Sequence, residues 1–202
     1  MPDKYPNFSA LAQREVRDRD FSVRRKQRLG ANAIVAPHGG GIEPGTSELA
    51  EAIAGDDLSF YAFEGTKLHG NRDLHITSTR FDEPEFLELI ANSPICITVH
   101  GEGSSKEAVF MGGLNGKIAS QIRASLESSG FKVEIHDNKN LQGIEQANIC
   151  NRGTTGRGVQ LELSEGLRRT FFEGLTRKGR KVTKDPFRRF VAAVRKGIVE
   201  AV

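Results

Sequence analysis

The segment Pro37-His38-Gly39-Gly40-Gly41-Ile42-Glu43 constrains the fold more strongly than any other part of the chain. An apolar run at residues 31–36 precedes it, and a helical pattern at residues 44–54 follows it. We therefore expect a glycine-rich loop between a buried strand and a helix, a place where open α/β sheets bind ligands. Glycine adopts backbone conformations that other residues avoid, so such a loop can bring the side chains of His38 and Glu43 to one point. Imidazole and carboxylate groups that converge on a point are typical metal ligands.

Strand and helix patterns alternate along the sequence, which predicts an α/β fold with a mixed, mostly parallel sheet flanked by helices. Besides 31–36, strands are predicted at 58–63, 74–79, 94–99, 131–135 and 158–163. Helices are predicted at 7–16, 46–54, 83–92, 114–128 and 165–174, and from Pro186 onward. Residues 137–157 are polar and contain glycine, which predicts a long loop of the kind that often carries function. We expect a single domain at residues 31–202, preceded at residues 1–30 by a helix and a charged lead-in.

Charge and composition limit the kinds of molecule that the chain is expected to bind. Lysine and arginine number 29 against 26 aspartate and glutamate residues, a net charge of +3. The basic segments at 14–28 and 168–189 are open to two interpretations, as solvated helix faces or as a surface that attracts a polyanion. They lack interleaved aromatic residues and any nucleic-acid motif, so we expect no nucleic-acid partner and favour a polycarboxylate substrate.

The sequence also bears on membrane association, on export and on the state of the two cysteines. No apolar run reaches membrane-spanning length, and the N-terminal residues lack the apolar core of a signal peptide. We expect no membrane association and a cytoplasmic protein as synthesised, which reaches an extracellular polymer by cell lysis or acts on an intracellular substrate. Cys96 and Cys150 are in neither metal-binding nor redox spacing, so we interpret them as buried small hydrophobic residues in a reducing compartment. We expect a monomer.

Three positions together suggest catalytic chemistry. His100 follows the predicted strand at 94–99, as His38 follows the strand at 31–36, so both imidazoles are expected at carboxyl ends of strands. Two histidines and Glu43 make the ligand set of a catalytic zinc ion that keeps a fourth position for water. Glu162 stands inside an apolar strand, where an unpaired carboxylate is costly. It is the candidate general base that accepts the proton of the metal-activated water.

Each of these residues also has a structural interpretation. A histidine after a strand can be a hydrogen-bonded structural residue, and Glu162 can be an outward-facing or salt-bridged residue. The five-residue spacing between His38 and Glu43 is not the familiar spacing of metallopeptidases. The segment His38-Gly39-Gly40-Gly41 also matches the oxyanion loop of many serine esterases, but the chain has no Gly-x-Ser-x-Gly elbow. A Walker loop and a complete dinucleotide-binding fingerprint are likewise missing from the sequence.

A longer pattern extends through most of the chain. After residues 37–48 come, in order, Leu74-His75-x-Thr77-Ser78-Thr79-x-Phe81-Asp82-Glu83-Pro84, His100-Gly101, Asn151-Arg152 and Gly158-Val159-Gln160-Leu161-Glu162. This pattern, which covers residues 31–175, resembles the poly-γ-glutamate hydrolase family of phages and of bacteria that meet γ-glutamate capsules.

The resemblance implies a fold like that of zinc carboxypeptidase A and the hydrolysis of γ-glutamyl amide bonds in poly-γ-glutamate. By the same likeness, Zn²⁺ is held by His38, Glu43 and His100, and Glu162 is the general base. Residues 31–202 would then form the zinc hydrolase domain.

Substrate-binding residues are predicted from the same resemblance and from charge. Asn71-Arg72 is similar to the Asn-Arg pair with which carboxypeptidase-like enzymes bind a substrate carboxylate. Asn151-Arg152 offers a second pair, since arginine makes bidentate hydrogen bonds to the free α-carboxylates of such a polymer. His75 is expected near the metal or on a substrate carboxylate. A surface salt bridge for the arginines and a structural role for His75 are the alternatives.

Three classes of function stay open on the sequence. The first is a zinc-dependent γ-glutamyl hydrolase that acts on poly-γ-glutamate. The second is a zinc amidohydrolase or peptidase that acts on another acyl-amino acid or γ-glutamyl conjugate. The third is a metal-free binding module, against which the intact set of His38, Glu43, His100 and Glu162 argues.

Overall fold

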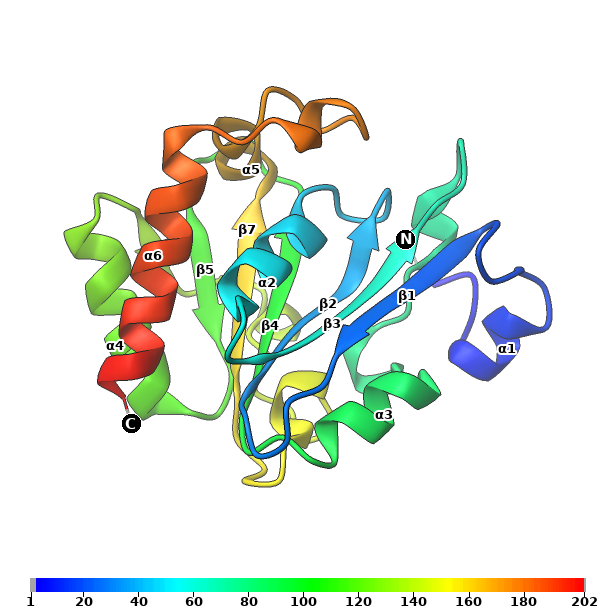
Figure 1. Cartoon of the computed structure of the whole chain (residues 1–202), viewed down its shortest axis with the longest axis horizontal. Helices are drawn as coiled ribbons and strands as arrows, with labels where there is room; N and C mark the ends of the chain where they lie inside the picture. The colour runs from blue at the N-terminus through cyan, green and yellow to red at the C-terminus, as the bar shows by residue number, and fades with distance from the viewer. Residues whose placement is uncertain (1–2, 202) are drawn as a thin grey trace.

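A mixed β-sheet with helices on both faces forms the body of the protein (Figure 1). The computed structural model describes residues 3–201, so the first two residues and the last lie outside the description. The strands are β1 (Phe21–Lys26), β2 (Ala33–Gly40), β3 (Ser59–Gly65), β4 (Cys96–Glu102), β5 (Val109–Gly112), β6 (Val133–Glu134) and β7 (Val159–Ser164). The α-helices are α1 (Phe8–Ala12), α2 (Thr46–Ala54), α3 (Pro84–Ile90), α4 (Gly116–Ser128), α5 (Glu165–Phe171) and α6 (Asp185–Glu200). Short 3-10 helices are η1 (Asn71–Leu74), η2 (Ser78–Arg80), η3 (Lys139–Leu141), η4 (Ile149–Arg152) and η5 (Gly179–Lys181).

The strand order is β1-β3-β2-β4-β7-β5-β6. Strands β3, β2, β4 and β7 are parallel to one another, whereas β1 is antiparallel to β3 and β5 is antiparallel to β7. The carboxyl ends of the parallel strands meet at one edge of the sheet, and the loops that follow them can share a site there.

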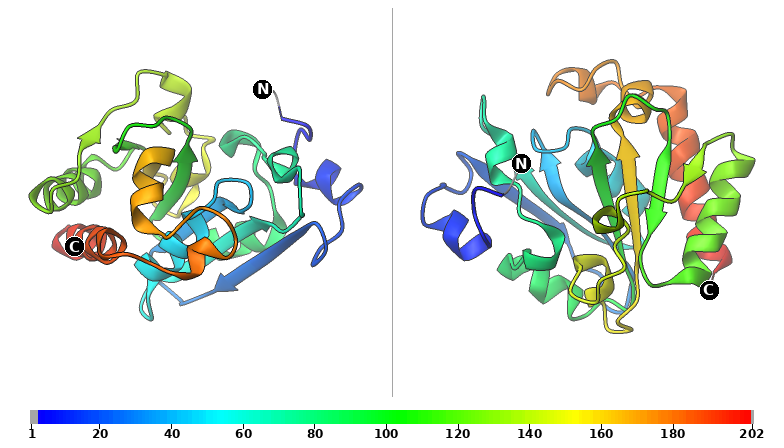
Figure 2. Two further views of the ribbon diagram at one scale, coloured as in Figure 1. Left: turned by 90° about the horizontal axis from the view of Figure 1, so that it is seen from above. Right: turned by 180° about the vertical axis from the view of Figure 1, so that it is seen from behind.

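Two hydrophobic layers cover the sheet. One layer contains buried side chains of α2, α4, α5 and α6, and the other contains those of α1, α3 and β1. Successive residues of β2 face opposite layers: Ile34 and Ala36 belong to the first, and Ala33 and Val35 to the second. A strand that is buried on both faces reads as a continuous apolar run, which explains the pattern at residues 31–36. Figures 1 and 2 show α4 and α6 side by side at the end of the sheet opposite α1.

The predicted α/β class, with a mixed and mostly parallel sheet in one domain, is confirmed. The helix at residues 46–54 was predicted with the bounds that α2 has. Glycine at both of its ends explains this accuracy, since Gly45 and Gly55 have positive φ angles that mark the start and the stop.

Two strands were missed, β1 in the charged lead-in and β5 in a presumed loop. β1 pairs with β3 over six residues, so this part of residues 1–30 is built into the same sheet as the rest of the chain. Phe21 is buried in the core, while Arg24 and Arg25 lie on this edge strand with ion pairs to carboxylates of α2, α3 and β3. Charged residues are common on edge strands, where they obscure the alternation of apolar and polar residues from which a strand is predicted.

The strand predicted at residues 74–79 is wrong. This segment runs from the end of η1 into η2, and its β-branched residues pair with no strand. The backbone N–H of Thr77 donates instead to the carboxylate of Asp3, 74 residues earlier in the sequence. A strand needs a neighbour at hydrogen-bonding distance, and local composition does not reveal whether the fold supplies one.

Within the described part of the chain, no helix combines the length and the apolar character needed to cross a bilayer.

Candidate metal centre

The glycine-rich loop after β2 brings His38 and Glu43 together. The register between β2 and β3 shifts after Ala36, and the backbone N–H of Glu43 then donates to the carbonyl of His38 at 2.8 Å. Gly40 has a φ of +64°, and a Cβ atom there would lie 2.5 Å from the carbonyl oxygen of Gly65 in β3. Only glycine satisfies both conditions, so this residue type is what lets the loop turn so tightly.

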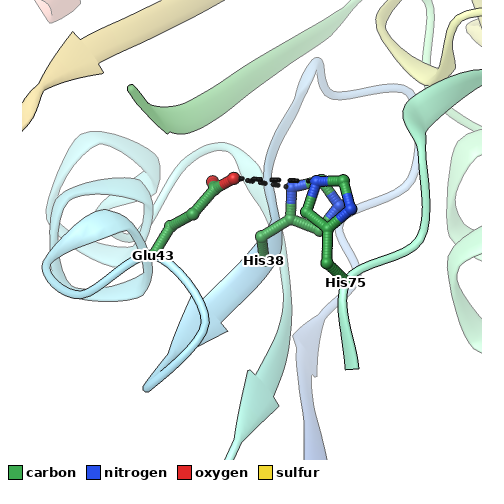
Figure 3. A group of neighbouring side chains, drawn as sticks. All are labelled: His38, Glu43 and His75. Carbon is green, nitrogen blue, oxygen red and sulfur yellow. Dashed lines mark ion pairs between the residues drawn. The ribbon is translucent and has the colours of Figure 1, made fainter. Parts of the chain in front are cut away.

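The side chains converge at this point, as Figure 3 shows for His38 and Glu43. His38 Nδ1 lies 3.1 Å from Glu43 Oε1 and 3.2 Å from His100 Nδ1. His100 Nδ1 lies 3.8 Å from Glu43 Oε2. These two histidines are almost completely buried. The structure therefore brings together the three residues that the sequence analysis placed around a metal ion.

The donor atoms suit a zinc ion. Ligands at ~2.0–2.1 Å from a tetrahedral zinc lie roughly 3.3 Å from one another, close to the two shortest separations above. The carbonyl of Ile76 accepts a hydrogen bond from Nε2 of His38 at 2.9 Å, so that nitrogen carries the proton and Nδ1 keeps its lone pair.

The facing imidazoles give a second test of the fit. His100 Nε2 has no hydrogen-bond partner among residues 3–201, although it is buried. If Nδ1 of His100 carries the ring proton, Nε2 has a buried lone pair that accepts no hydrogen bond. If Nε2 carries the proton instead, the lone pairs of His100 Nδ1 and His38 Nδ1 face each other. A cation between the nitrogens removes the repulsion between two lone pairs, and by this test the residues fit a metal ion.

Neighbouring histidines keep the carboxylate of Glu43 ionised. Burial alone would raise the pKa of Glu43, but His38, His100 and His75 lower it to about 2. Burial lowers the pKa of His100 to about 3, so its imidazole is neutral at neutral pH. Burial also acts to lower the pKa of His38, yet the facing Glu43 carboxylate raises it above its ordinary value. One anionic carboxylate beside imidazole lone pairs is a site that attracts a divalent cation.

Glu162 faces the same cavity. β7 pairs with β4 in parallel, with His100 and Glu162 as direct partners in the register. A cavity of about 450 Å³ is lined by His38, Glu43, His100 and Glu162 together with the loops around them. Burial, followed by the charges of Glu43 and Glu102, raises the pKa of Glu162 well above its ordinary value. A carboxylate with a raised pKa beside a reaction centre is suited to accept a proton near neutral pH.

His75 borders the centre from the other side (Figure 3). Its ring lies against the ring of His38, tilted by 31° with centroids 4.0 Å apart, and its Nε2 lies 3.9 Å from Glu43 Oε1. Ligand atoms of His38, Glu43 and His75 all lie within 4.8 Å of one another, so His75 is also placed where it could bind a metal. The pKa of His75 is lowered, first by the neighbouring imidazole of His38, with which it cannot easily share a second positive charge, and then by burial.

Arg72 borders a second cavity. This cavity, of about 380 Å³, is lined by Glu43 and His75, by the cationic Lys4 and Arg72, and by the carboxylates of Asp3 and Asp73. Glu43 and His75 thus line both cavities, which lie on either side of them.

The other predicted substrate residues lie outside both cavities. Asn71 accepts from the backbone N–H of Lys67 and donates to its carbonyl. The amide of Asn151 is buried and accepts from two backbone N–H groups and donates to two carbonyls. Arg152 donates to the carbonyls of Thr79, Phe81 and Ala147. Because their polar groups hold loops in place, we exclude these three residues from the proposed substrate contacts.

Sequence reasoning did not single out several residues that the structure brings to the site. Gln160 donates from Nε2 to Glu162 Oε1 at 3.0 Å, and Lys139 lines the larger cavity. Gln160 stands two positions before Glu162 in an apolar strand, so a period of two could have placed both side chains on one face. Asp3, which accepts a hydrogen bond from His75, carried no signal in the sequence.

Comparisons with known proteins identify the relatives of this chain. The family model of poly-gamma-glutamate hydrolase matches residues 5–193. Two relatives of Bacillus subtilis (strain 168), the SPbeta prophage-derived protein YoqZ and the protein YmaC, are each 39% identical over 202 residues. The matches cover 99% of this chain and 73% of YoqZ, and 98% of this chain and 85% of YmaC.

Solved structures match closely as well. A bacteriophage poly-gamma-glutamate hydrolase superimposes with a TM-score of 0.94 at 31% identity, covering 98% of each chain. A zinc-free structure of YndL gives a TM-score of 0.92 at 33% identity, also over 98% of each chain. An N-formylglutamate amidohydrolase from Ralstonia eutropha shares only the fold, with a TM-score of 0.53 at 12% identity over 90% of this chain and 97% of the other.

An α/β fold with an imidazole–carboxylate centre at the carboxyl edge of its sheet defines a class of hydrolase sites. Within that class, the chain belongs to the poly-γ-glutamate hydrolase family and is a hydrolase. The family that the sequence motifs indicated is thereby confirmed.

Proposed function

We propose that the protein hydrolyses the γ-glutamyl amide bonds of poly-γ-glutamate and that it does so with a zinc ion. The observation that carries the proposal is the convergence of His38, Glu43 and His100 at 3.1–3.8 Å beside Glu162 in one cavity. The family match, the bacteriophage relative and the zinc-free state described for YndL support it.

His38, Glu43 and His100 would hold the metal, and His75 lies beside them. A zinc ion bound there polarises an amide carbonyl and lowers the pKa of a bound water towards ~7. The neutral imidazole of His100 and the ionised carboxylate of Glu43 are the protonation states that metal binding requires.

Glu162 carries the proton in this proposal. Its carboxylate accepts a proton as water attacks the carbonyl carbon, and it returns that proton to the departing amine nitrogen. Gln160 holds Oε1 of Glu162 with an N–H donor, which leaves Oε2 for the proton. Burial raises the pKa of this carboxyl, so it holds the proton until the more basic amine nitrogen takes it.

Substrate carboxylates would be bound by cations on both sides of the centre. Poly-γ-glutamate has a free α-carboxylate on each residue. Lys139 lines the larger cavity and Arg72 the smaller one, with His75 between them. A polymer that crosses the centre meets a cationic group on either side, which suits a polyanion.

A small γ-glutamyl conjugate or another acyl-amino acid is the second candidate substrate. The larger cavity, at about 450 Å³, has the volume of a small-molecule site. A panel of the polymer and small amides, assayed at equal concentrations of amide bonds, separates the two candidates. The monomeric state and cytoplasmic synthesis followed by release on lysis remain our predictions, testable by light scattering and by fractionation of producing cells.

The decisive experiment measures zinc content, polymer viscosity and end-group release for the wild type and for Glu162→Gln. We expect about one zinc per chain in both proteins, with turnover that chelator abolishes in the wild type. Loss of the proton acceptor should lower kcat on the order of 10²- to 10⁴-fold while zinc is retained. Glu107→Gln is the matched control, since Glu107 lines neither of the two cavities described above.

Each result has a distinct meaning for the proposal. An active Glu162→Gln variant would remove the base from the mechanism. Zinc binding without cleavage of the polymer would keep the centre and favour the small substrates. A wild type that binds no zinc after reconstitution would overturn the metal site.

A further inference from the structure

The carboxylate of Asp3 is buried beside the centre. Its side chain is only 6% exposed, and it accepts hydrogen bonds from Thr77 N–H at 2.7 Å, Thr77 Oγ1 at 2.6 Å and Arg80 Nη2 at 3.1 Å, all on Oδ2. Its other oxygen, Oδ1, lies 2.7 Å from Nδ1 of His75. Figure 2 shows the chain from residue 3 onward beside the segment that contains His75.

These contacts define the tautomer of His75. An ionised carboxylate only accepts hydrogen bonds, so Nδ1 of His75 must carry the proton that it shares with Asp3. In the neutral ring, Nε2 then has the lone pair, and this atom lies on the side of Glu43. Contact with the ring of His38 restricts rotation of the ring. The hydrogen bonds from Thr77 and His75 outweigh burial and lower the pKa of Asp3, which keeps the carboxylate ionised.

We infer that Asp3 is a positioning residue of the active site, which holds His75 so that Nε2 presents its lone pair to the substrate. The inference rests on the proposed function, in which the polymer crosses the centre between the two cavities that His75 lines. A lone pair at that place accepts a hydrogen bond from a substrate amide N–H. A carboxylate that fixes the orientation and tautomer of a functional imidazole is a recurrent arrangement in active sites.

The contact lies outside the pattern by which the family is recognised. The match to the family model begins at residue 5, two positions after Asp3. Asp3 also anchors the loop through Thr77 and Arg80, so a purely structural role must be separated from an effect that passes through His75.

Asp3→Asn separates the two roles because asparagine keeps one acceptor oxygen and replaces the other with an NH₂ donor. Two donors of Thr77 face Oδ2, so the amide oxygen of asparagine takes that place and its NH₂ group points to His75. The NH₂ group donates to Nδ1, which forces the proton of the ring onto Nε2. The lone pair then leaves the cavity although the loop keeps its anchor.

The experiment combines kinetics with NMR of the full chain labelled with ¹⁵N-histidine. We expect Asp3→Asn to lower kcat on the order of 10- to 100-fold with KM within about threefold. In a His75→Ala background, the same substitution should change kcat less than about twofold. Arg80→Met is the matched control, since it removes a donor from Asp3 and leaves the hydrogen bond to His75. It should keep kcat within about twofold.

The NMR readout does not depend on activity or on metal. At pH 8, wild-type His75 should show the Nδ1–H tautomer and Asp3→Asn the Nε2–H tautomer, with His75→Ala for the assignment. The inference would be overturned if Asp3→Asn and Arg80→Met lowered kcat equally, or if Asp3→Asn lowered kcat as much in the His75→Ala background as in the wild type. Either result would mean that Asp3 only anchors the loop. If the wild type does not cleave the polymer, the proposed function fails, and an Nε2–H tautomer in the wild type would separately refute the role of Asp3.

Discussion

At the scale of single residues, Gly101 shows how closely the centre is packed. Its backbone N–H donates to Oε2 of Glu43 at 2.8 Å. A Cβ atom at this position would lie 2.9 Å from Cβ of Glu43 and 2.8 Å from the guanidinium carbon of Arg168. The glycine that follows His100 in the motif is therefore required by space, because any side chain there would displace Glu43 from His38.

Glu102 offers a test of the proton acceptor. Burial and Glu43 raise the pKa of Glu162 most, and Glu102 adds to the rise. Only the ionised carboxylate accepts a proton, so kcat/KM should fall as the pH falls through the pKa of Glu162. Glu102→Gln removes one negative charge, lowers this pKa and should move the acidic limb of the profile to lower pH.

The measurement is a pH profile of kcat/KM for the wild type and for Glu102→Gln. Glu107→Gln makes the same change of charge at an exposed position and serves as the control. An acidic limb that stays in place in Glu102→Gln, or moves to higher pH, would contradict the assignment of that limb to Glu162.

At the scale of elements, the side chain of Asn151 joins the long connection between β6 and β7 to its neighbours. Asn151 in η4 accepts from Leu114 N–H and Gly158 N–H and donates to the carbonyls of Gly143 and Glu145. Its amide thus joins the start of α4, the start of β7 and the loop that lines the larger cavity. Four backbone groups depend on it, and buried groups of this kind are costly to leave unpaired.

Asn151→Ala should lower the free energy of unfolding by about 3 kcal/mol, since removing one partner of a buried hydrogen bond costs ~1–3 kcal/mol. Urea unfolding followed by circular dichroism measures the change. Asn92→Ala is the control, because Asn92 is exposed and donates one hydrogen bond, to the carbonyl of Glu88. If Asn151→Ala unfolds like the wild type but has a raised KM, the residue is a substrate contact as the sequence motif first suggested.

At the scale of the whole molecule, charge favours a polyanionic substrate. The chain has a net charge of +3, and many of its arginines already pair with carboxylates at the surface. The attraction is therefore modest and long-ranged, and salt screens it over a Debye length of ~8 Å at physiological ionic strength.

Raising the salt concentration should lower kcat/KM for poly-γ-glutamate and leave kcat at saturating polymer nearly unchanged. The physical reason is that screening slows the encounter with a polyanion but does not reach a buried centre. Initial rates at low and at saturating polymer, between 20 mM and 500 mM NaCl as rough limits, measure both quantities. A kcat/KM that does not respond to salt would show that charge does not guide the polymer to the protein.

Features that depend on neighbouring residues can be predicted from the sequence. The strand, glycine loop and helix at residues 31–54 follow from apolar periodicity and from glycines at positions with positive φ. The same local chemistry marked His38, Glu43, His100 and Glu162, because polar groups at the ends or in the middle of apolar strands need a reason to be there. The order of the motifs was sufficient to indicate the family.

Features that depend on partners far away in the chain become visible only in the folded structure. Charged β1 becomes a strand because β3 supplies its hydrogen bonds, and residues 74–79 do not because Asp3 takes the N–H of Thr77. The amide of Asn151 takes backbone groups of distant loops as partners for the same reason. Hydrogen-bonding groups take whichever partner the fold brings within about 3 Å, and a sequence pattern records the group but not the partner.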